Sequence, residues 1–188
     1  MLEKERNEVL VHRRIEYLAM NFGKYMTVTS VDMPLVSNAT IAAYHLYGIE
    51  AGIVLPQKAK DWAFSIIESL DNPPADIIDV AMSGGLPELN ESLQAVIGER
   101  DRQLAGRWLL CKLNRNLQSG LSDFRSILLQ AKQVAQSTDL GDDENGLYDE
   151  IEYSICLVED GICGSMESCR ADLVNALAKY KEGVEVGW

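Results

Sequence analysis

The fold class is decided by residues 121–137, LSDFRSILLQAKQVAQS, in the second half of the chain. Apolar side chains recur there at steps of three and four residues, which is the spacing of a helix with one buried face. Residues 166–180, MESCRADLVNALAKY, show the same spacing. The two apolar stripes are Leu121, Phe124, Leu128, Ala131 and Ala135, and Met166, Cys169, Leu173, Leu177 and Tyr180. These segments predict two amphipathic helices.

Helix signals continue on both sides of these segments. No proline follows Pro87, so nothing forbids long helices in the second half. In the first half, Ser37 or Asn38 can cap a helix, and Pro56 and Pro87 suit the first turn of one. The β-branched residues 27–34 could form one short strand, but no partner strand is evident. The sequence therefore predicts an all-α fold, a compact bundle or short stack of antiparallel helical hairpins with about seven to eight helices.

The length of 188 residues fits one helical domain, 1–188, with 1–98 and 99–188 as alternative sub-lobes. A helix is expected at residues 3–22. The N-terminus is charged where a signal peptide would be apolar, and no apolar run approaches the ~20 residues of a membrane span. We therefore expect a cytoplasmic protein with no membrane contact, and reduced thiols packed in its interior as small apolar groups. The four cysteines are Cys111, Cys156, Cys163 and Cys169.

The net charge of −12 is concentrated in one segment of the chain. Residues 133–169 contain ten acidic residues and no Lys or Arg, so the other residues together are close to neutral. A field of this sign disfavours direct binding to nucleic acid and favours a cationic partner. A solvated acidic loop and helix face remains the simpler explanation.

Known catalytic and cofactor motifs are absent from the sequence. The two histidines, His12 and His45, lie in no metal-binding or catalytic spacing, and structural roles are expected for both. The sequence lacks a phosphate-binding glycine loop and a nucleophile elbow. No cofactor is expected.

The nearest approach to a metal motif is the segment 141–152. Asp143, Asn145, Asp149 and Glu152 match ligand positions of a calcium-binding EF-hand loop. Gly141 occupies the first position, where the loop needs an oxygen-bearing side chain. We therefore expect an acidic turn over residues 141–146, followed by a helix over 148–158, and not a calcium site.

The candidate partner-binding residues are Tyr148, Asp149, Glu150, Glu152 and Tyr153. Tyrosines often anchor protein interfaces, and carboxylates steer cationic partners. This acidic, tyrosine-containing helix resembles the bacterial immunity proteins that neutralise cationic nuclease toxins. The resemblance implies an antitoxin-like inhibitor that binds a basic protein.

Two other functions stay open at this point. A helical enzyme could use a carboxylate pair or a divalent ion held by Asp142, Asp143, Asp149 and Glu152. A helical scaffold or adaptor would instead present apolar contacts, for which Trp62, Trp108 and Trp188 are candidates. A stoichiometric metal ion would favour the enzyme, and salt-independent apolar binding would favour the scaffold.

Overall fold

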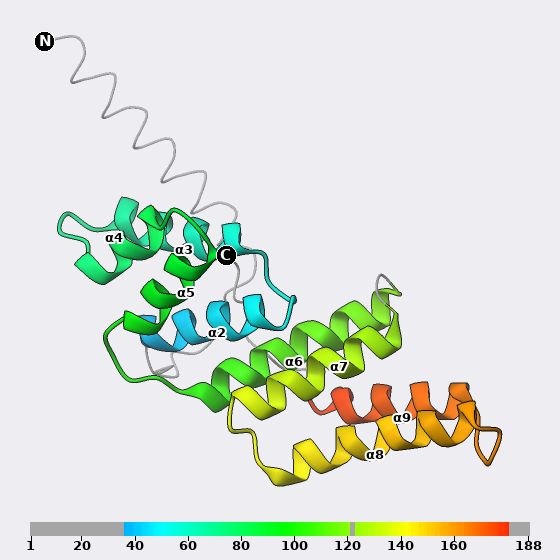
Figure 1. Cartoon of the computed structure of the whole chain (residues 1–188). Helices are drawn as coiled ribbons and strands as arrows, with labels where there is room; N and C mark the ends of the chain where they lie inside the picture. Colours follow the sequence, from blue (N-terminus) through cyan, green and yellow to red (C-terminus); the bar gives the residue numbers. More distant parts are fainter. Residues whose placement is uncertain (1–35, 121–122, 181–188) are drawn as a thin grey trace, which may run out of the picture. The chain divides into compact units, whose positions relative to one another are not determined.

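The computed structural model describes residues 36–120 and 123–180. The chain divides into two units, residues 1–35 and 36–188, and all described residues belong to the second. These residues form eight helices and no strand, which confirms the predicted all-α fold (Figure 1). The helices are α2 (Asn38–Glu50), α3 (Pro56–Ser69), α4 (Ala75–Met82), α5 (Leu86–Ala95), α6 (Arg102–Ser119), α7 (Phe124–Ser137), α8 (Asp142–Glu159) and α9 (Met166–Ala178).

Local signals in the sequence set most of the helix ends. The Ser37 hydroxyl accepts a hydrogen bond from the Thr40 amide, as expected of a cap at the start of α2. Side chains of Asp101, Asp123 and Ser165 cap α6, α7 and α9 in the same way. Pro56 opens α3 at a position where its missing N–H is harmless. These caps satisfy amide groups that have no partner inside the helix.

Helix α2 lies at the centre of the second unit. Ten consecutive residues, 39–48, are buried, because α3, α5, α6 and α7 all pack against this helix. The short helices α3, α4 and α5 lie together on one side, and α6–α9 lie on the other as successive antiparallel helices (Figure 1). One hydrophobic core runs from α2 to α9. The core thus joins both parts of residues 36–180.

Helix α8 begins earlier than the sequence predicts. The segment 142–146 is the first part of the helix and not a turn. The turn lies at Gly141, whose φ of 109° favours glycine. Three acidic residues, 142–144, stand in the first helical turn, where the helix dipole favours negative charge. The side-chain amide of Asn145 donates to the Gly141 carbonyl at 3.1 Å and closes this turn.

The thiols divide between core and surface. Cys111 and Cys169 are buried, as their positions on apolar stripes predict. Cys156 and Cys163 are exposed, so the prediction that they pack in the interior is wrong. Cys156 lies on the solvent side of α8, and Cys163 follows that helix in a loop.

Several predictions lie outside the described residues. These are the helix over 3–22, the strand-like run 27–34, and the roles suggested for His12 and Trp188. Among the residues that are described, no helix is long and apolar enough to cross a membrane.

Candidate protein-interaction site

Helix α8 carries the candidate residues and packs between α7 and α9. Its buried side chains Tyr148, Ile151 and Ile155 follow one another at steps of three and four residues and face the core. The remaining positions of the helix face solvent or the edges of its neighbours. This division determines which candidate residues a partner could reach.

Tyr148 is not available to a partner. Its side chain is 0% exposed, and its hydroxyl has no hydrogen-bond partner among the described residues. Burial raises the pKa of this phenol well above its ordinary value, and the nearby Tyr180 and Glu144 raise it further. The predicted role of Tyr148 as an interface anchor is therefore wrong. The residue falls on the stripe that α8 buries against its neighbours.

Replacing Tyr148 with Phe is expected to stabilise the protein. A buried hydroxyl without a partner carries an uncompensated desolvation penalty, and phenylalanine keeps the ring without it. We expect a gain of about 1 kcal/mol in the free energy of unfolding, measured by urea denaturation.

The matched control is Tyr153→Phe, because Tyr153 is exposed and its hydroxyl is free to contact water. This variant should change stability by less than about 0.5 kcal/mol. A loss of stability in Tyr148→Phe would show that its hydroxyl has a partner in solution.

Asp149 and Glu152 share a single cation of α7. Lys132 Nζ lies 2.7 Å from Asp149 Oδ1 and 2.6 Å from Glu152 Oε2. Hydrogen bonds to Asp149 and then to Glu152 raise the pKa of the Lys132 ammonium above its ordinary value. These two carboxylates therefore connect α8 to α7, and much of their charge is neutralised within the molecule. The sequence indicates the acids, but not this partner twenty residues away.

Glu150 and Tyr153 are the candidates that remain accessible. Glu150 is exposed, and no described residue pairs with its carboxylate. Tyr153 is 65% exposed. Both residues point away from the α8 core stripe, so a partner can reach them without unfolding the helix.

A groove of about 470 Å³ runs along α8 and α9 next to these residues. Glu150 and Ser154 line it from α8, and Asp172 and Asn175 line it from α9. Asp172, which sequence analysis missed, is exposed and has no ion-pair partner among the described residues. The groove thus holds two free carboxylates on facing helices. The sequence does not single out Asp172, because it lies outside the acidic segment 133–169.

Lys179, the cation that the described residues contribute to this groove, is already engaged. Lys179 Nζ donates to Glu144 Oε1 at 3.0 Å, and the Tyr180 hydroxyl donates to the same oxygen at 3.2 Å. Burial alone would raise the pKa of Glu144, but these hydrogen bonds lower it below its ordinary value. Glu144 therefore links the start of α8 to the end of α9. Within residues 36–120 and 123–180, this contact leaves Glu150 and Asp172 without a neutralising lysine.

The residues that match a calcium loop do not form one. Asp143, Asn145, Asp149 and Glu152 lie along a helix, and an EF-hand loop would need them to wrap around an ion. In the described part of the chain, no group of three or more His, Cys, Asp or Glu side chains is placed to hold a metal ion. Asp142 and Asp143 occupy the first turn of α8, apart from the pair that binds Lys132.

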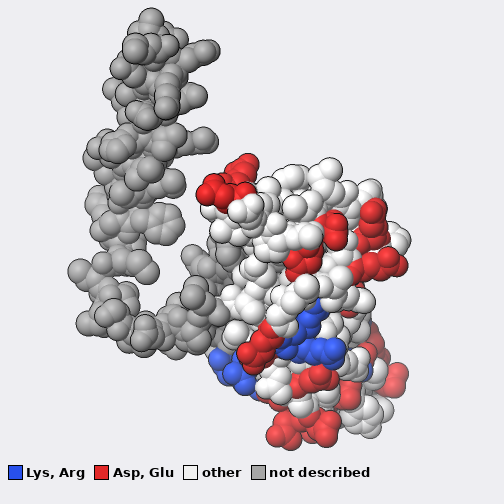
Figure 2. Space-filling model, turned by 90° about the vertical axis from the view of Figure 1, so that its left-hand side faces the viewer, with Lys and Arg blue, Asp and Glu red and all other residues white. Residues whose placement is uncertain are grey.

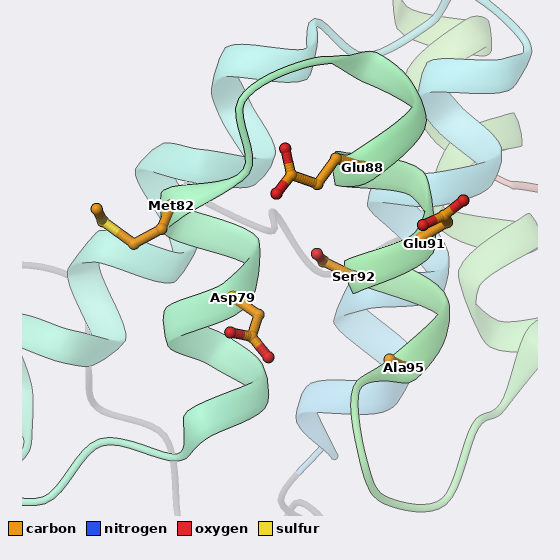
Figure 3. Close-up of a pocket in the computed structure, with 6 residues that line it drawn as sticks. All are labelled: Asp79, Met82, Glu88, Glu91, Ser92 and Ala95. Carbon is orange, nitrogen blue, oxygen red and sulfur yellow. The ribbon is translucent and has the colours of Figure 1, made fainter.

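A second recess lies between α4 and α5, which sequence analysis did not single out. It has a volume of about 310 Å³ and is lined by Asp79, Met82, Glu88, Glu91, Ser92 and Ala95. Figure 3 shows Asp79, Glu88 and Ser92 projecting into the space between the two helices. One Glu88 oxygen accepts a hydrogen bond from the Gly84 amide at 2.6 Å, so this carboxylate also holds the turn between the helices.

Acidic side chains are distributed widely over the surface. On the face shown in Figure 2 they lie at the top, right and bottom of the described part, whereas Lys and Arg gather across its middle. On this face, acidic side chains are therefore not confined to α8. A specific site needs further features, and the α8 surface has them in its accessible tyrosine and its adjoining groove.

The fold and surface define an all-α protein with an acidic groove beside an exposed tyrosine. Comparison with family models, curated proteins and solved structures finds no match to this chain.

Proposed function

We propose that this protein is a protein-binding module that engages a basic partner through α8 and the α8–α9 groove. The observation that carries the proposal is the pair of unneutralised carboxylates, Glu150 and Asp172, that line this groove beside the exposed Tyr153. Carboxylates of this kind attract cationic side chains, and an exposed tyrosine supplies contact area that becomes buried on binding.

The roles of these residues differ in kinetic terms. Glu150 and Asp172 act over a distance, so they accelerate encounter with a positively charged surface. Tyr153 acts after contact, when its ring leaves water, so it slows dissociation. Asp149 and Glu152 contribute less to attraction, because Lys132 offsets their charge.

The most concrete form of this function is an inhibitor similar to bacterial immunity proteins. In such proteins, tyrosines and carboxylates on a helix occupy the toxin, and an acidic helix is complementary to a cationic protein. The acidic α8 surface and the overall charge of −12 support this form of the proposal.

A pull-down from host lysate at low salt tests the proposed function. The bait variant is Glu150→Gln with Asp172→Asn, which removes two free carboxylates and leaves the Lys132 ion pairs intact. A basic protein retained by the wild type should be lost from this variant. With the purified partner, we expect the association rate to fall about tenfold in the variant, and this difference to shrink as salt rises.

The matched control is Glu68→Gln with Asp71→Asn. Both side chains are exposed in the α3–α4 region, and the variant changes the net charge by the same amount. The control should retain the partner. Equal loss from both variants would mean that the partner responds to total charge and not to the α8–α9 groove.

A further inference from the structure

Helices α7 and α8 meet through two layers of ion pairs that fix their alignment. Lys132 binds Asp149 and Glu152 in one layer, and Arg125 Nη2 lies 2.6 Å from Glu159 Oε1 in the other. The two helices run antiparallel, as Figure 1 shows. The residues between the two layers on each helix must therefore face each other.

On α7, the steps from Arg125 to Leu129 and from Leu129 to Lys132 are four and three residues. On α8, the steps from Glu152 to Cys156 and from Cys156 to Glu159 are also four and three. Because the helices are antiparallel, Leu129 and Cys156 consequently lie within about 1.5 Å of the same level, between the two ion-pair layers. Neither residue faces the core.

Leu129 is 56% exposed, and Cys156 is an exposed free thiol. Tyr153 lies one helical turn before Cys156 on α8 and is also exposed. These three exposed side chains, on neighbouring turns of α7 and α8, are called here the apolar centre. Charged side chains bound it at both ends, in an arrangement similar to a binding hot spot enclosed by a polar rim.

The charges around the apolar centre are mainly negative. Asp149, Glu150, Glu152 and Glu159 surround it with four carboxylates, against the two cations Lys132 and Arg125. A second copy of this chain would bring the same negative rim against it. A partner with Lys or Arg around an apolar side chain is complementary in both respects.

We propose that the apolar centre formed by Leu129, Tyr153 and Cys156 receives a large apolar side chain of a partner protein, with that partner's Lys and Arg side chains on the surrounding carboxylates. This proposal rests on the protein-binding function proposed above and names the kind of side chain that the site recognises. The α8–α9 groove attracts the partner, and the apolar centre selects it.

Two peptide probes separate these roles: one with phenylalanine between two pairs of lysines, and one with alanine in its place. Each is titrated into the isotopically labelled full chain, and the backbone amide signals are followed by NMR. The phenylalanine peptide should shift the signals of residues 129, 153 and 156 and bind at least about tenfold more tightly than the alanine peptide.

The test variant is Leu129→Gln with Tyr153→Gln, which removes the apolar surface without changing charge. It should bind both peptides with equal, weak affinity. The control is Ile97→Gln, which removes an exposed apolar side chain elsewhere and should behave as the wild type.

Equal affinity of the two peptides for the wild type, with shifts along Glu150 and Asp172, would overturn the apolar centre and leave the acidic docking function standing. Shifts confined to the α4–α5 recess, or no shift at millimolar peptide, would overturn both. Dimerisation of the wild type that Leu129→Gln abolishes, measured by analytical ultracentrifugation, would assign the apolar centre to a second copy and overturn the proposed partner.

Discussion

Lowering the pH from 7 to 4.5 is expected to remove about 2 to 3 kcal/mol of stability through His45 alone. The imidazole is buried in α2, and neither ring nitrogen has a hydrogen-bond partner among the described residues. Desolvation, followed by the charge of Lys112, lowers the pKa of His45 from 6.5 to about 4. The neutral ring stacks near Trp62, with ring centroids 5.3 Å apart.

The sign of this effect follows from the two pKa values. Between pH 6.5 and about 4 the unfolded chain binds a proton on His45 that the folded protein does not. The stabilising contribution is therefore complete above pH 6.5 and is lost as the pH falls toward 4. Urea denaturation at pH 7, 5.5 and 4.5 would measure it.

His45→Met isolates this contribution. Methionine fills a similar volume and brings no titrating nitrogen into the core, so its stability should fall less between pH 7 and 4.5 than that of the wild type. Carboxylates such as Glu144, whose pKa is lowered in the folded state, lose stabilisation over the same range in both proteins. Parallel pH profiles for wild type and variant would contradict the assignment to His45.

Gly106→Ala is expected to destabilise the protein by about 1–3 kcal/mol, although alanine is the better helix former. A Cβ at this position in α6 would lie 2.8 Å from Thr138 Cβ, closer still to the Thr138 hydroxyl, and 3.0 Å from Leu140 Cδ1. Thr138 is fully buried, and its hydroxyl donates to the Val134 carbonyl at 2.6 Å. The neighbouring chain therefore has little freedom to move away.

Gly146→Ala is the same substitution, but it is expected to change stability in the opposite direction. Gly146 lies inside α8, and no atom lies within 4 Å of a Cβ built there. Its replacement should stabilise the protein by about 0.5–1 kcal/mol. Thermal or urea unfolding of both variants would test the pair, and equal shifts of the same sign would refute the close approach of α6 to Thr138.

The helices could be predicted because their signals are local. Ser37 caps α2 and Pro56 opens α3 through contacts within a few residues, so the printed sequence contains all that is needed. The start of α8 differs from the prediction, because a glycine at position 146 favours a turn in sequence terms. Three acidic residues at the helix N-terminus stabilise the helix, and they offset the low helix propensity of that glycine.

The candidate site was predicted less well than the fold. Glu150 and Tyr153 remain accessible, whereas Tyr148 is buried and Asp149 and Glu152 hold Lys132. Charge and residue type can be read along the chain, but a residue's access to a partner depends on which side of α8 its neighbours cover. The apolar spacing that predicts α7 and α9 is also present in α8. It marks the buried face of that helix, formed by Tyr148, Ile151 and Ile155.

The sequence by itself determined that the described chain is helical and that its negative charge is concentrated near α8, because periodicity, capping and charge are properties of neighbouring residues. Tertiary structure alone decided that Gly106 must lack a side chain, that Lys132 pairs with two of the candidate acids, and that Asp172 joins Glu150 in one groove. Each of these facts depends on residues distant in sequence, whose contact is set by how the helices pack.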